Sequence, residues 1–423
     1  MAHCRVKYFS VIMAIFTVCL VFSLPWRQKI EIKNEEAGLQ IIFKKTNAQM
    51  SADNLHPLQR KRLSFTSPNS SSSSESQDNN KELRSRGRNI PSATNTKRNL
   101  SLEISTRFPW LVRKNYLPNF YTKRNASRHS KQLYQDAYIA FVHNQKSGGS
   151  TLKMCMKNMA PSIGADDPFI ICDVNAGNYY QSMDTATVRV FHKFYAGGHT
   201  FRQCDYTTHA CSYITILRDP FERAISSYEY CKVRNELHCQ IRDATKVSLR
   251  EWAKFQGSFF FRQLIYNPEY CTDKFDGAID ALRVKKGIPE APRQIPCWYR
   301  NELMLSHAMT TVDKANVLDY VLENLEDWFA MIGINSEYDI TLQLLEGAYQ
   351  LPFSQCSGQE LNYNPYIAEG EIRTHKQRNE IVADLRKQLY SDPEVFDALY
   401  YDLKIYQKAQ EIFLEQKRLF FNK

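Results

Sequence analysis

A short run of lysine, serine, glycine and threonine is the stretch of this 423-residue chain best suited to chemistry. It reads Lys-Ser-Gly-Gly-Ser-Thr over residues 146–151. The apolar residues 138–142 before it are typical of a buried strand, and the apolar spacing after it predicts a helix that stops by Pro161. A strand, a glycine loop and a helix N-terminus together present backbone N–H groups to a phosphate. The stretch therefore predicts an anion-binding loop.

Each residue type in this loop suits the binding of an anion. Gly148 and Gly149 permit a tight turn and a close approach of the anion to the backbone. Lys146 adds a positive charge, and the hydroxyls of Ser150 and Thr151 can donate hydrogen bonds or cap the helix. The order differs from that of the nucleotide-triphosphate loop, in which the lysine follows the glycines and precedes a magnesium-binding hydroxyl. Taken alone, the loop is also compatible with an ordinary strand-to-helix turn.

A second stretch places an arginine directly after another apolar run. Residues 213–217 are expected to form a buried strand, and Arg218 follows it. Ser226 lies eight positions further along, on a predicted helix. An arginine fork and a hydroxyl at this spacing suit a second phosphate. The alternative is a surface ion-pair network of Arg218, Asp219 and Arg223 at the start of the helix.

Together, the two stretches resemble the 5′-phosphosulfate and 3′-phosphate motifs of sulfotransferases that use 3′-phosphoadenosine 5′-phosphosulfate (PAPS). The likeness is greatest to the Golgi membrane-bound carbohydrate branch, which includes the heparan sulfate 2-O- and 6-O-sulfotransferases, and it extends over residues 138–420. It implies PAPS as sulfate donor, no metal, and a role for Lys146 in stabilising charge on the bridging oxygen. The donor-binding residues that it implies are Lys146, Ser147, Gly148, Gly149, Ser150, Thr151, Arg218 and Ser226.

A histidine lies between the two motifs. Residues 188–195 alternate as a strand does and lead into a Gly-Gly-His sequence that ends at His199. Related carbohydrate sulfotransferases have a catalytic histidine at this position, so the resemblance implies that His199 is the general base. A neutral imidazole can take the proton of a sugar hydroxyl as attack develops. The alternative candidates, in order, are His192, then His143 and His209.

The expected elements indicate an α/β fold, with a P-loop-like, mostly parallel central sheet flanked by helices, as in PAPS sulfotransferases. Beyond the second motif, apolar spacing predicts further elements. These are a helix over 313–328, a strand over 329–334, a helix over 340–348 and a long C-terminal helix over 395–420. The aromatic-rich stretch 252–264 is compatible with core packing. The alternative is that it borders the adenine or acceptor site, with Arg262 and Gln263 as the contacts.

The cysteines favour disulfides over zinc, because no tight Cys or Cys/His cluster occurs. Cys4 and Cys19 lie near the N-terminus, which leaves nine of the 11 cysteines for the rest of the chain. A secretory compartment would oxidise them. The expected local pairs are Cys231–Cys239 and Cys204–Cys211, and His209 falls within the second loop. An odd number leaves at least one thiol unpaired, and the candidate is Cys155, on the apolar face of the helix after the first motif.

The N-terminal third has a different character. Residues 1–7 are expected to be a cytoplasmic tail and residues 8–26 a transmembrane signal anchor, since the apolar run is long for a cleaved signal peptide, which is the alternative. Residues 27–130 are polar, basic and serine-rich, which predicts a flexible stem before a lumenal sulfotransferase domain over 131–423. The glycosylation sequons of this stem are at Asn69, Asn99 and Asn125.

The net charge of +10 belongs to the stem and not to the expected catalytic domain. Residues 27–130 contain 20 Lys and Arg against 8 Asp and Glu, whereas residues 131–423 contain 33 against 37. An anion-binding surface on the domain must therefore be local. The global charge is not an argument for a polyanionic acceptor or for nucleic acid.

These features predict a single-pass type II Golgi membrane protein that transfers the sulfuryl group of PAPS to a glycan hydroxyl. The resemblance implies a glycosaminoglycan acceptor of the heparan or chondroitin/dermatan type. Galactose or hexosamine on glycoproteins or glycolipids is the second possibility. A non-catalytic glycan-binding membrane protein of the same fold is the alternative outside enzymes, and no nucleic-acid partner is expected.

Overall fold

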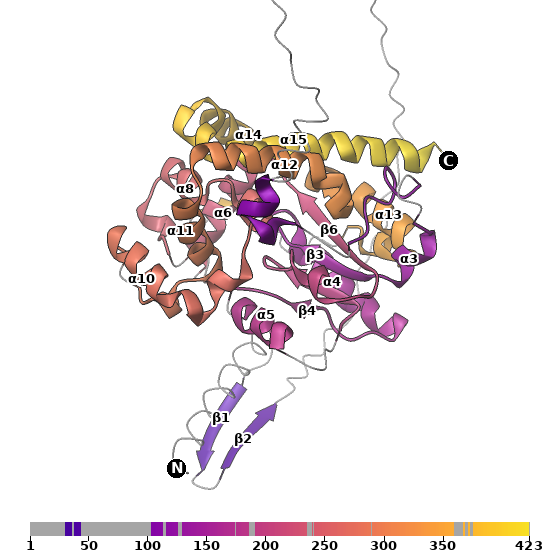
Figure 1. Cartoon of the computed structure of the whole chain (residues 1–423), viewed down its shortest axis with the longest axis horizontal. Helices are drawn as coiled ribbons and strands as arrows, with labels where there is room; N and C mark the ends of the chain where they lie inside the picture. Colours follow the sequence, from indigo (N-terminus) through magenta and orange to yellow (C-terminus); the bar gives the residue numbers. More distant parts are fainter. Residues whose placement is uncertain are drawn as a thin grey trace, which may run out of the picture. The chain divides into compact units, whose positions relative to one another are not determined.

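The computed structural model describes a short N-terminal hairpin and most of the chain from residue 103 onward. The described residues are 30–35, 38–43, 103–112, 116–125, 129–173, 175–185, 191–234, 239, 241–288, 290–358, 367–368, 371–372 and 375–422. The chain divides into two compact units, Met1–Arg86 and Gly87–Lys423. In the first unit, β1 (Ile30–Glu35) and β2 (Gly38–Phe43) pair as an antiparallel hairpin. The other elements belong to the second unit (Figure 1).

The centre of the second unit is a sheet of five parallel strands. In spatial order these are β4 (Phe169–Ile170), β5 (Phe194–Gly197), β3 (Tyr138–Val142), β6 (Cys211–Leu217) and β7 (Phe329–Ile334). Every residue of β5, β6 and β7 is buried. Continuous apolar runs of this kind are typical of parallel strands, because crossover helices cover both faces of the sheet. The predicted α/β fold with a parallel central sheet and flanking helices is confirmed.

Helices connect and cover the strands. The α-helices of the described residues are α3 (Lys131–Asp136), α4 (Gly149–Met159), α5 (Ala176–Thr185), α6 (Pro220–Val233), α8 (Leu249–Gln256), α9 (Phe259–Leu264), α10 (Asp276–Lys285), α11 (Cys297–Ala308), α12 (Thr311–Trp328), α13 (Tyr338–Tyr349), α14 (His375–Ser391) and α15 (Pro393–Phe421). The 3₁₀ helices are η1 (Pro109–Leu111), η2 (Ala160–Ile163), η3 (Gln203–Tyr206), η4 (Ala244–Lys246), η5 (Pro268–Cys271), η6 (Asp273–Phe275), η7 (Pro292–Gln294), η8 (Asn335–Glu337) and η9 (Phe353–Cys356). Two short strands, β8 (Ile367–Ala368) and β9 (Glu371–Ile372), pair with each other.

The C-terminal elements follow their predictions closely. The predicted strand over 329–334 is β7, and the three predicted helices are α12, α13 and α15. A capping box between Thr310 and Asp313 starts α12, and the side chain of Asp392 caps α15. Figure 1 shows α15 running alongside α12 and α14, and α15 also packs on β7. The long C-terminal helix is therefore part of the layer that covers the sheet.

The folded unit begins upstream of the predicted domain boundary at residue 131. Ile104, Phe108 and Leu111 lie in the main hydrophobic core. The backbone N–H of Leu117 donates to the carbonyl of Cys211 at 2.9 Å, and that of Phe120 donates to Ala330 at 2.9 Å. Residues 27–130 are polar on average, so their composition did not indicate that these few apolar residues join the core. The segment that contains Leu117 and Phe120, called the strap below, is therefore packed on β6 and β7 although it lies within the predicted stem.

Four disulfides join eight of the nine cysteines beyond the N-terminal region, and the two predicted local pairs are among them. The pairs are Cys155–Cys356, Cys204–Cys211, Cys231–Cys239 and Cys271–Cys297. The prediction that Cys155 is unpaired is wrong. Its position on the buried face of α4 brings it against η9, where Cys356 lies 201 residues away in sequence. Cys172 is the cysteine outside these disulfides.

The predictions for the N-terminal region fall mostly outside the described residues. This applies to the tail over 1–7, to the signal anchor over 8–26 and to the sequons at Asn69 and Asn99. Within the described part of the chain, no helix combines the length and apolar character needed to cross a membrane. Asn125 is described, and its side chain is exposed.

Candidate functional site

Three loops meet at the carboxyl edge of the sheet. Because β5, β3 and β6 are parallel neighbours, the residues that follow them emerge side by side. His199 follows β5, residues 143–148 follow β3, and Arg218 follows β6. This edge, where loops and helix N-termini converge, is the usual ligand-binding edge of an open parallel sheet. The topology therefore brings together the three segments singled out in the sequence.

The loop after β3 is shaped by its glycines. Gly148 has φ of +85°, and a Cβ on it would lie 2.9 Å from the ring of Tyr338. Gly149 begins α4, and a Cβ there would lie 1.9 Å from the imidazole of His143. Lys146 also has a positive φ, of 66°, which is uncommon for a residue with a side chain. Neither glycine position can take a larger residue, so the tight path of the loop depends on both.

Two buried polar atoms in this loop lack a hydrogen-bond partner within the described part of the protein. They are the hydroxyl Oγ of Ser147 and the amide Oδ1 of Asn144. Ser147 is 1% exposed, and Asn144 is 3% exposed. A buried polar atom without a partner costs free energy, and such atoms in native structures call for an explanation such as a ligand. The loop thus fits an anion that would accept from Ser147 and from the N–H groups that open α4.

The second motif touches the first. Nη1 of Arg218 donates to the main-chain carbonyl of Lys146 at 3.5 Å. Arg218 precedes α6, whose first turn is capped by the Asp219 carboxylate, which accepts from the N–H groups of Phe221 and Glu222. The two loops, 72 residues apart in sequence, therefore form one site. The two motifs that the resemblance assigns to one donor molecule are therefore neighbours in the structure.

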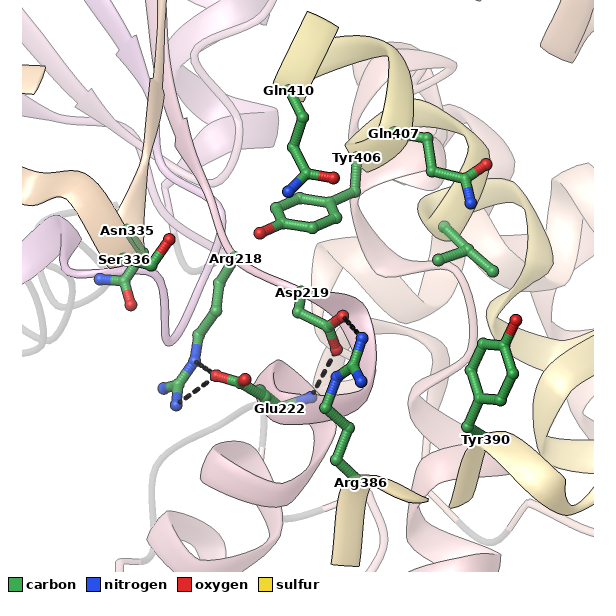
Figure 2. A pocket seen from close by; sticks show the side chains of 11 residues that line it. Arg218, Asp219, Glu222, Asn335, Ser336, Arg386, Tyr390, Tyr406, Gln407 and Gln410 are labelled. Carbon is green, nitrogen blue, oxygen red and sulfur yellow. Dashed lines mark hydrogen bonds and ion pairs between the residues drawn. The ribbon is translucent and has the colours of Figure 1, made fainter. Parts of the chain in front are cut away.

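A pocket of about 480 Å³ opens beside Arg218 (Figure 2). Its lining comes from the start of α6, from η8, and from α14 and α15: Arg218, Asp219, Glu222, Asn335, Ser336, Arg386, Tyr390, Leu403, Tyr406, Gln407 and Gln410. Its lining includes two ion pairs, one between Arg218 and Glu222 at 3.2 Å and one between Arg386 and Asp219 at 2.6 Å. The second pair raises the pKa of Arg386, chiefly through its hydrogen bond to Asp219. The pocket is thus lined by tyrosines, amides and paired charges.

One face of α6 carries partners for both motif cations. Glu222, Ser226 and Tyr230 recur every four residues and therefore lie along one side of the helix. Glu222 pairs with Arg218, and the ammonium of Lys146 lies 3.7 Å from the ring centroid of Tyr230. A cation at this distance is attracted to the ring face. The sequence analysis did not identify Tyr230, although its spacing from Ser226 could have indicated a shared face.

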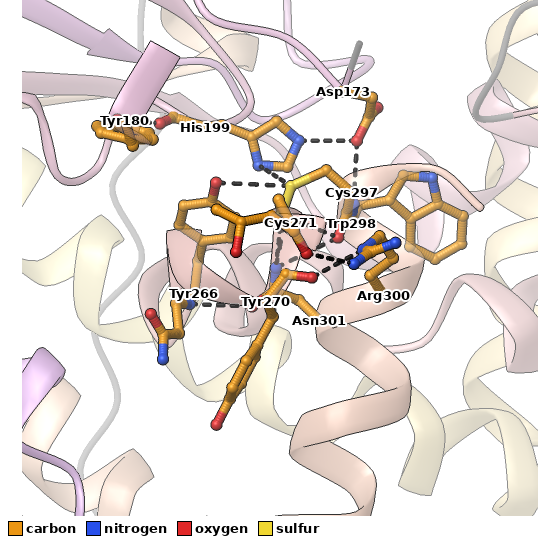
Figure 3. The surroundings of a disulfide bond; sticks show 12 residues. Asp173, Tyr180, His199, Tyr266, Tyr270, Cys271, Cys297, Trp298, Arg300 and Asn301 are labelled. Atoms are coloured by element: carbon orange, nitrogen blue, oxygen red, sulfur yellow. Dashed lines mark hydrogen bonds and ion pairs between the residues drawn. A yellow bond between two sulfur atoms is a disulfide. The ribbon is translucent and has the colours of Figure 1, made fainter. Parts of the chain in front are cut away.

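His199 is enclosed by protein groups (Figure 3). The residue is 5% exposed, and its Nε2 lies 2.7 Å from Oδ1 of Asp173. The same carboxylate oxygen accepts from the backbone N–H of Trp298 at 3.0 Å. The other ring nitrogen, Nδ1, lies 3.9 Å from Sγ of Cys297, in the Cys271–Cys297 disulfide. The histidine is therefore oriented by a carboxylate that the sequence analysis did not identify.

The alternative histidines lie in different places. His192 precedes β5 and stacks on Phe169, the first residue of β4, so it lies near the amino ends of the strands. His209 packs on Tyr138, the first residue of β3, at the same edge. His143 follows β3 and lies against Gly149. Of the alternatives, only His143 shares the edge of the sheet with Lys146 and Arg218.

Arg262 and Gln263 on α9 play structural parts. The amide of Gln263 donates to the carbonyl of His143 at 3.1 Å and to that of Gly198 at 3.0 Å. It thereby ties the loop after β3 to the loop after β5. Arg262 forms an ion pair with Glu302 at 3.2 Å. The structure gives Gln263 a positioning role, and the interpretation of Arg262 and Gln263 as ligand contacts stays a prediction.

No protein-family model matches this sequence, and neither does any curated protein. The fold and the site define an α/β protein with two adjoining loops suited to anions at the carboxyl edge of its parallel sheet. A function for the chain is therefore inferred from that geometry and from the motifs.

Proposed function

We propose that this chain is a PAPS-dependent carbohydrate sulfotransferase. The observation that carries the proposal is the contact between Arg218 and the carbonyl of Lys146, which joins the two motifs into one site. A loop for a 5′-phosphosulfate and a loop for a 3′-phosphate must lie within one nucleotide's length of each other. When bound, PAPS supplies the sulfuryl group.

The donor would be held by residues of both loops. Its 5′-phosphosulfate would accept from the start of α4 and from the hydroxyls of Ser147, Ser150 and Thr151, in the loop shaped by Gly148 and Gly149. Lys146 would stabilise the charge that develops on the bridging oxygen. Arg218 and Ser226, at the start and in the middle of the α6 segment, would bind the 3′-phosphate. The work of these residues is to position charges and to neutralise them.

The proposed base is His199, oriented by Asp173. A carboxylate at 2.7 Å fixes the ring and stabilises the imidazolium that proton transfer creates. Because both ring nitrogens have protein neighbours, one of them must exchange its neighbour for the acceptor hydroxyl during catalysis. This enclosure is also the observation that favours the alternative of a non-catalytic glycan-binding protein of the same fold.

The proposed acceptor is a glycosaminoglycan of the heparan or chondroitin/dermatan type, in the Golgi lumen. The proposed signal anchor over 8–26, the proposed glycosylated stem and the likeness of the motifs support this setting. The second candidate is galactose or hexosamine on glycoproteins or glycolipids. The test is to incubate the purified full-length chain in detergent with labelled PAPS and a panel of desulfated polysaccharides. Label on a defined disaccharide supports the proposal, whereas donor binding without transfer supports the non-catalytic alternative.

The replacement Arg218→Ala should weaken binding of 3′-phosphoadenosine 5′-phosphate by at least about 10-fold, since a charge-assisted hydrogen bond is worth about 1.5–3 kcal/mol. Adenosine 5′-phosphate lacks the 3′-phosphate, and its affinity should change by less than about twofold. Isothermal titration calorimetry with both nucleotides measures the difference. Equal losses for the two would contradict the assignment of Arg218 to the 3′-phosphate.

The replacement Tyr230→Leu should lower kcat for sulfate transfer by about fivefold, because a cation–π contact of about 1 kcal/mol no longer holds the Lys146 ammonium. Tyr230→Phe keeps the ring and should retain near-normal kcat. Binding of the bisphosphate nucleotide should be similar in both variants. If Tyr230→Phe loses as much activity as Tyr230→Leu, the ring face is not what positions the lysine.

A further inference from the structure

Arg218 is already paired with an anion of its own chain. Its Nε lies 3.3 Å and its Nη2 3.2 Å from Oε2 of Glu222 (Figure 2). The third contact, from Nη1, goes to the carbonyl of Lys146 at 3.5 Å. The Arg218 side chain is 20% exposed and that of Glu222 is 36% exposed, so both are partly shielded from water. The edge of the guanidinium that suits a bidentate phosphate is therefore occupied by a carboxylate.

The two carboxylates beside Arg218 differ in how firmly they are held. The Asp219 carboxylate accepts from the N–H groups of Phe221 and Glu222 and from Arg386 at 2.6 Å. In the described residues, the hydrogen bonds of the Glu222 carboxylate both come from Arg218. Asp219 is thus part of the helix start, whereas Glu222 can leave by rotation of its side chain alone.

We propose that Glu222 is an internal competitor for the donor's 3′-phosphate. It holds Arg218 in position when no nucleotide is bound and gives up that contact when the phosphate arrives. A phosphate beside an undisplaced Glu222 would meet like-charge repulsion, so displacement of the carboxylate is part of the binding reaction. Glu222 thereby lowers donor affinity and favours release of the spent bisphosphate nucleotide. This inference rests on the proposed function and adds a residue that regulates affinity at the same site.

The test compares Glu222→Gln with the unchanged chain, using full-length protein and 3′-phosphoadenosine 5′-phosphate as the probe. Loss of the charge should tighten binding by about three- to fivefold, the upper part of the range expected for an ion pair at a partly exposed site. Binding of adenosine 5′-phosphate, which lacks the 3′-phosphate, should stay within about twofold. Glu222→Asp, which shortens the reach by one methylene, should tighten binding by a smaller factor.

The matched control is Asp280→Asn on α10. Like Glu222, Asp280 pairs with an arginine close to it in sequence, Arg283, at 2.6 Å, and it does not line the pocket beside Arg218. The Asp280→Asn replacement changes the net charge by the same amount as Glu222→Gln and should leave the affinity for 3′-phosphoadenosine 5′-phosphate unchanged. A thermal melting curve for each variant checks that it is folded.

Two results would overturn the inference, and they can be told apart. If the unchanged chain binds the bisphosphate nucleotide and neither Glu222 variant, folded, binds it more tightly, Glu222 is not a competitor and the proposed function stands. If neither the unchanged chain nor the variants bind the nucleotide, the proposed function fails, and the inference fails with it.

Discussion

Replacement of Lys146 by alanine is expected to lower kcat for sulfate transfer from PAPS by about 10²–10³, the usual effect of removing one preorganised group that stabilises developing charge. The lysine lies in the tight turn before α4, with a positive φ, and its ammonium is held on the ring of Tyr230. This arrangement aims the charge at one place before the donor binds, so that little reorganisation is needed during the reaction. Initial rates at saturating donor and acceptor measure the effect.

The control for this replacement is Lys157→Ala. Lys157 lies near the other end of α4 and pairs with Asp167 at the surface, at 3.1 Å. The Lys157→Ala replacement also removes one lysine charge, from α4 itself and not from the turn before it, and should leave kcat unchanged. Near-normal turnover of the Lys146→Ala variant would remove this lysine from the mechanism. An equal loss in both variants would indicate a general effect on α4 and not a role in catalysis.

Replacement of His199 by glutamine is expected to lower kcat by about 10²–10⁴, the contribution of a general base, and to leave binding of the bisphosphate nucleotide intact. Glutamine keeps a polar group in a buried position, whereas alanine would remove the side chain that pairs with Asp173. Asp173→Asn should also lower kcat, because the orienting carboxylate is lost. The single-turnover rate with pre-bound donor isolates the chemical step from binding.

His192→Gln is the control for the base assignment. His192 lies near the amino ends of the strands, so its replacement should leave the single-turnover rate unchanged. If His199→Gln turns over normally, or if it loses the nucleotide as well, His199 is not the base. A large loss in the His192 variant alone would move the base to the opposite edge of the sheet and contradict the site as a whole.

The parts of this structure that local sequence determines were predictable. Strands β3, β6 and β7 are continuous apolar runs, and α12 and α15 combine apolar spacing with side-chain caps at their first turns. The two loops follow the strands that were expected to precede them. Neighbouring parallel strands end at the same edge of a sheet, so the two loops lie close together once β3 and β6 are adjacent.

The parts that depend on tertiary contacts were not predictable. Asp173 reaches His199 from a segment 26 residues away, and no spacing rule indicates that pair. Cys155 was interpreted as an unpaired core thiol because nothing near it in sequence identifies Cys356. The strap that contains Leu117 has a polar, basic neighbourhood, and it meets β6 through the backbone N–H of Leu117 and the ring of Tyr116, which lies on Tyr213. In each case the decisive neighbour is distant in the chain.

The disulfide between Cys155 and Cys356 links the helix behind the first loop, α4, to η9, which lies 201 residues further along the chain. A truncated chain that stops before residue 356 would lack this disulfide on α4 even though it contained both motifs. Expression in a reducing host would have the same consequence for the full-length chain. The quality of a recombinant preparation should therefore be judged by its thiol content before any sulfate transfer is assayed.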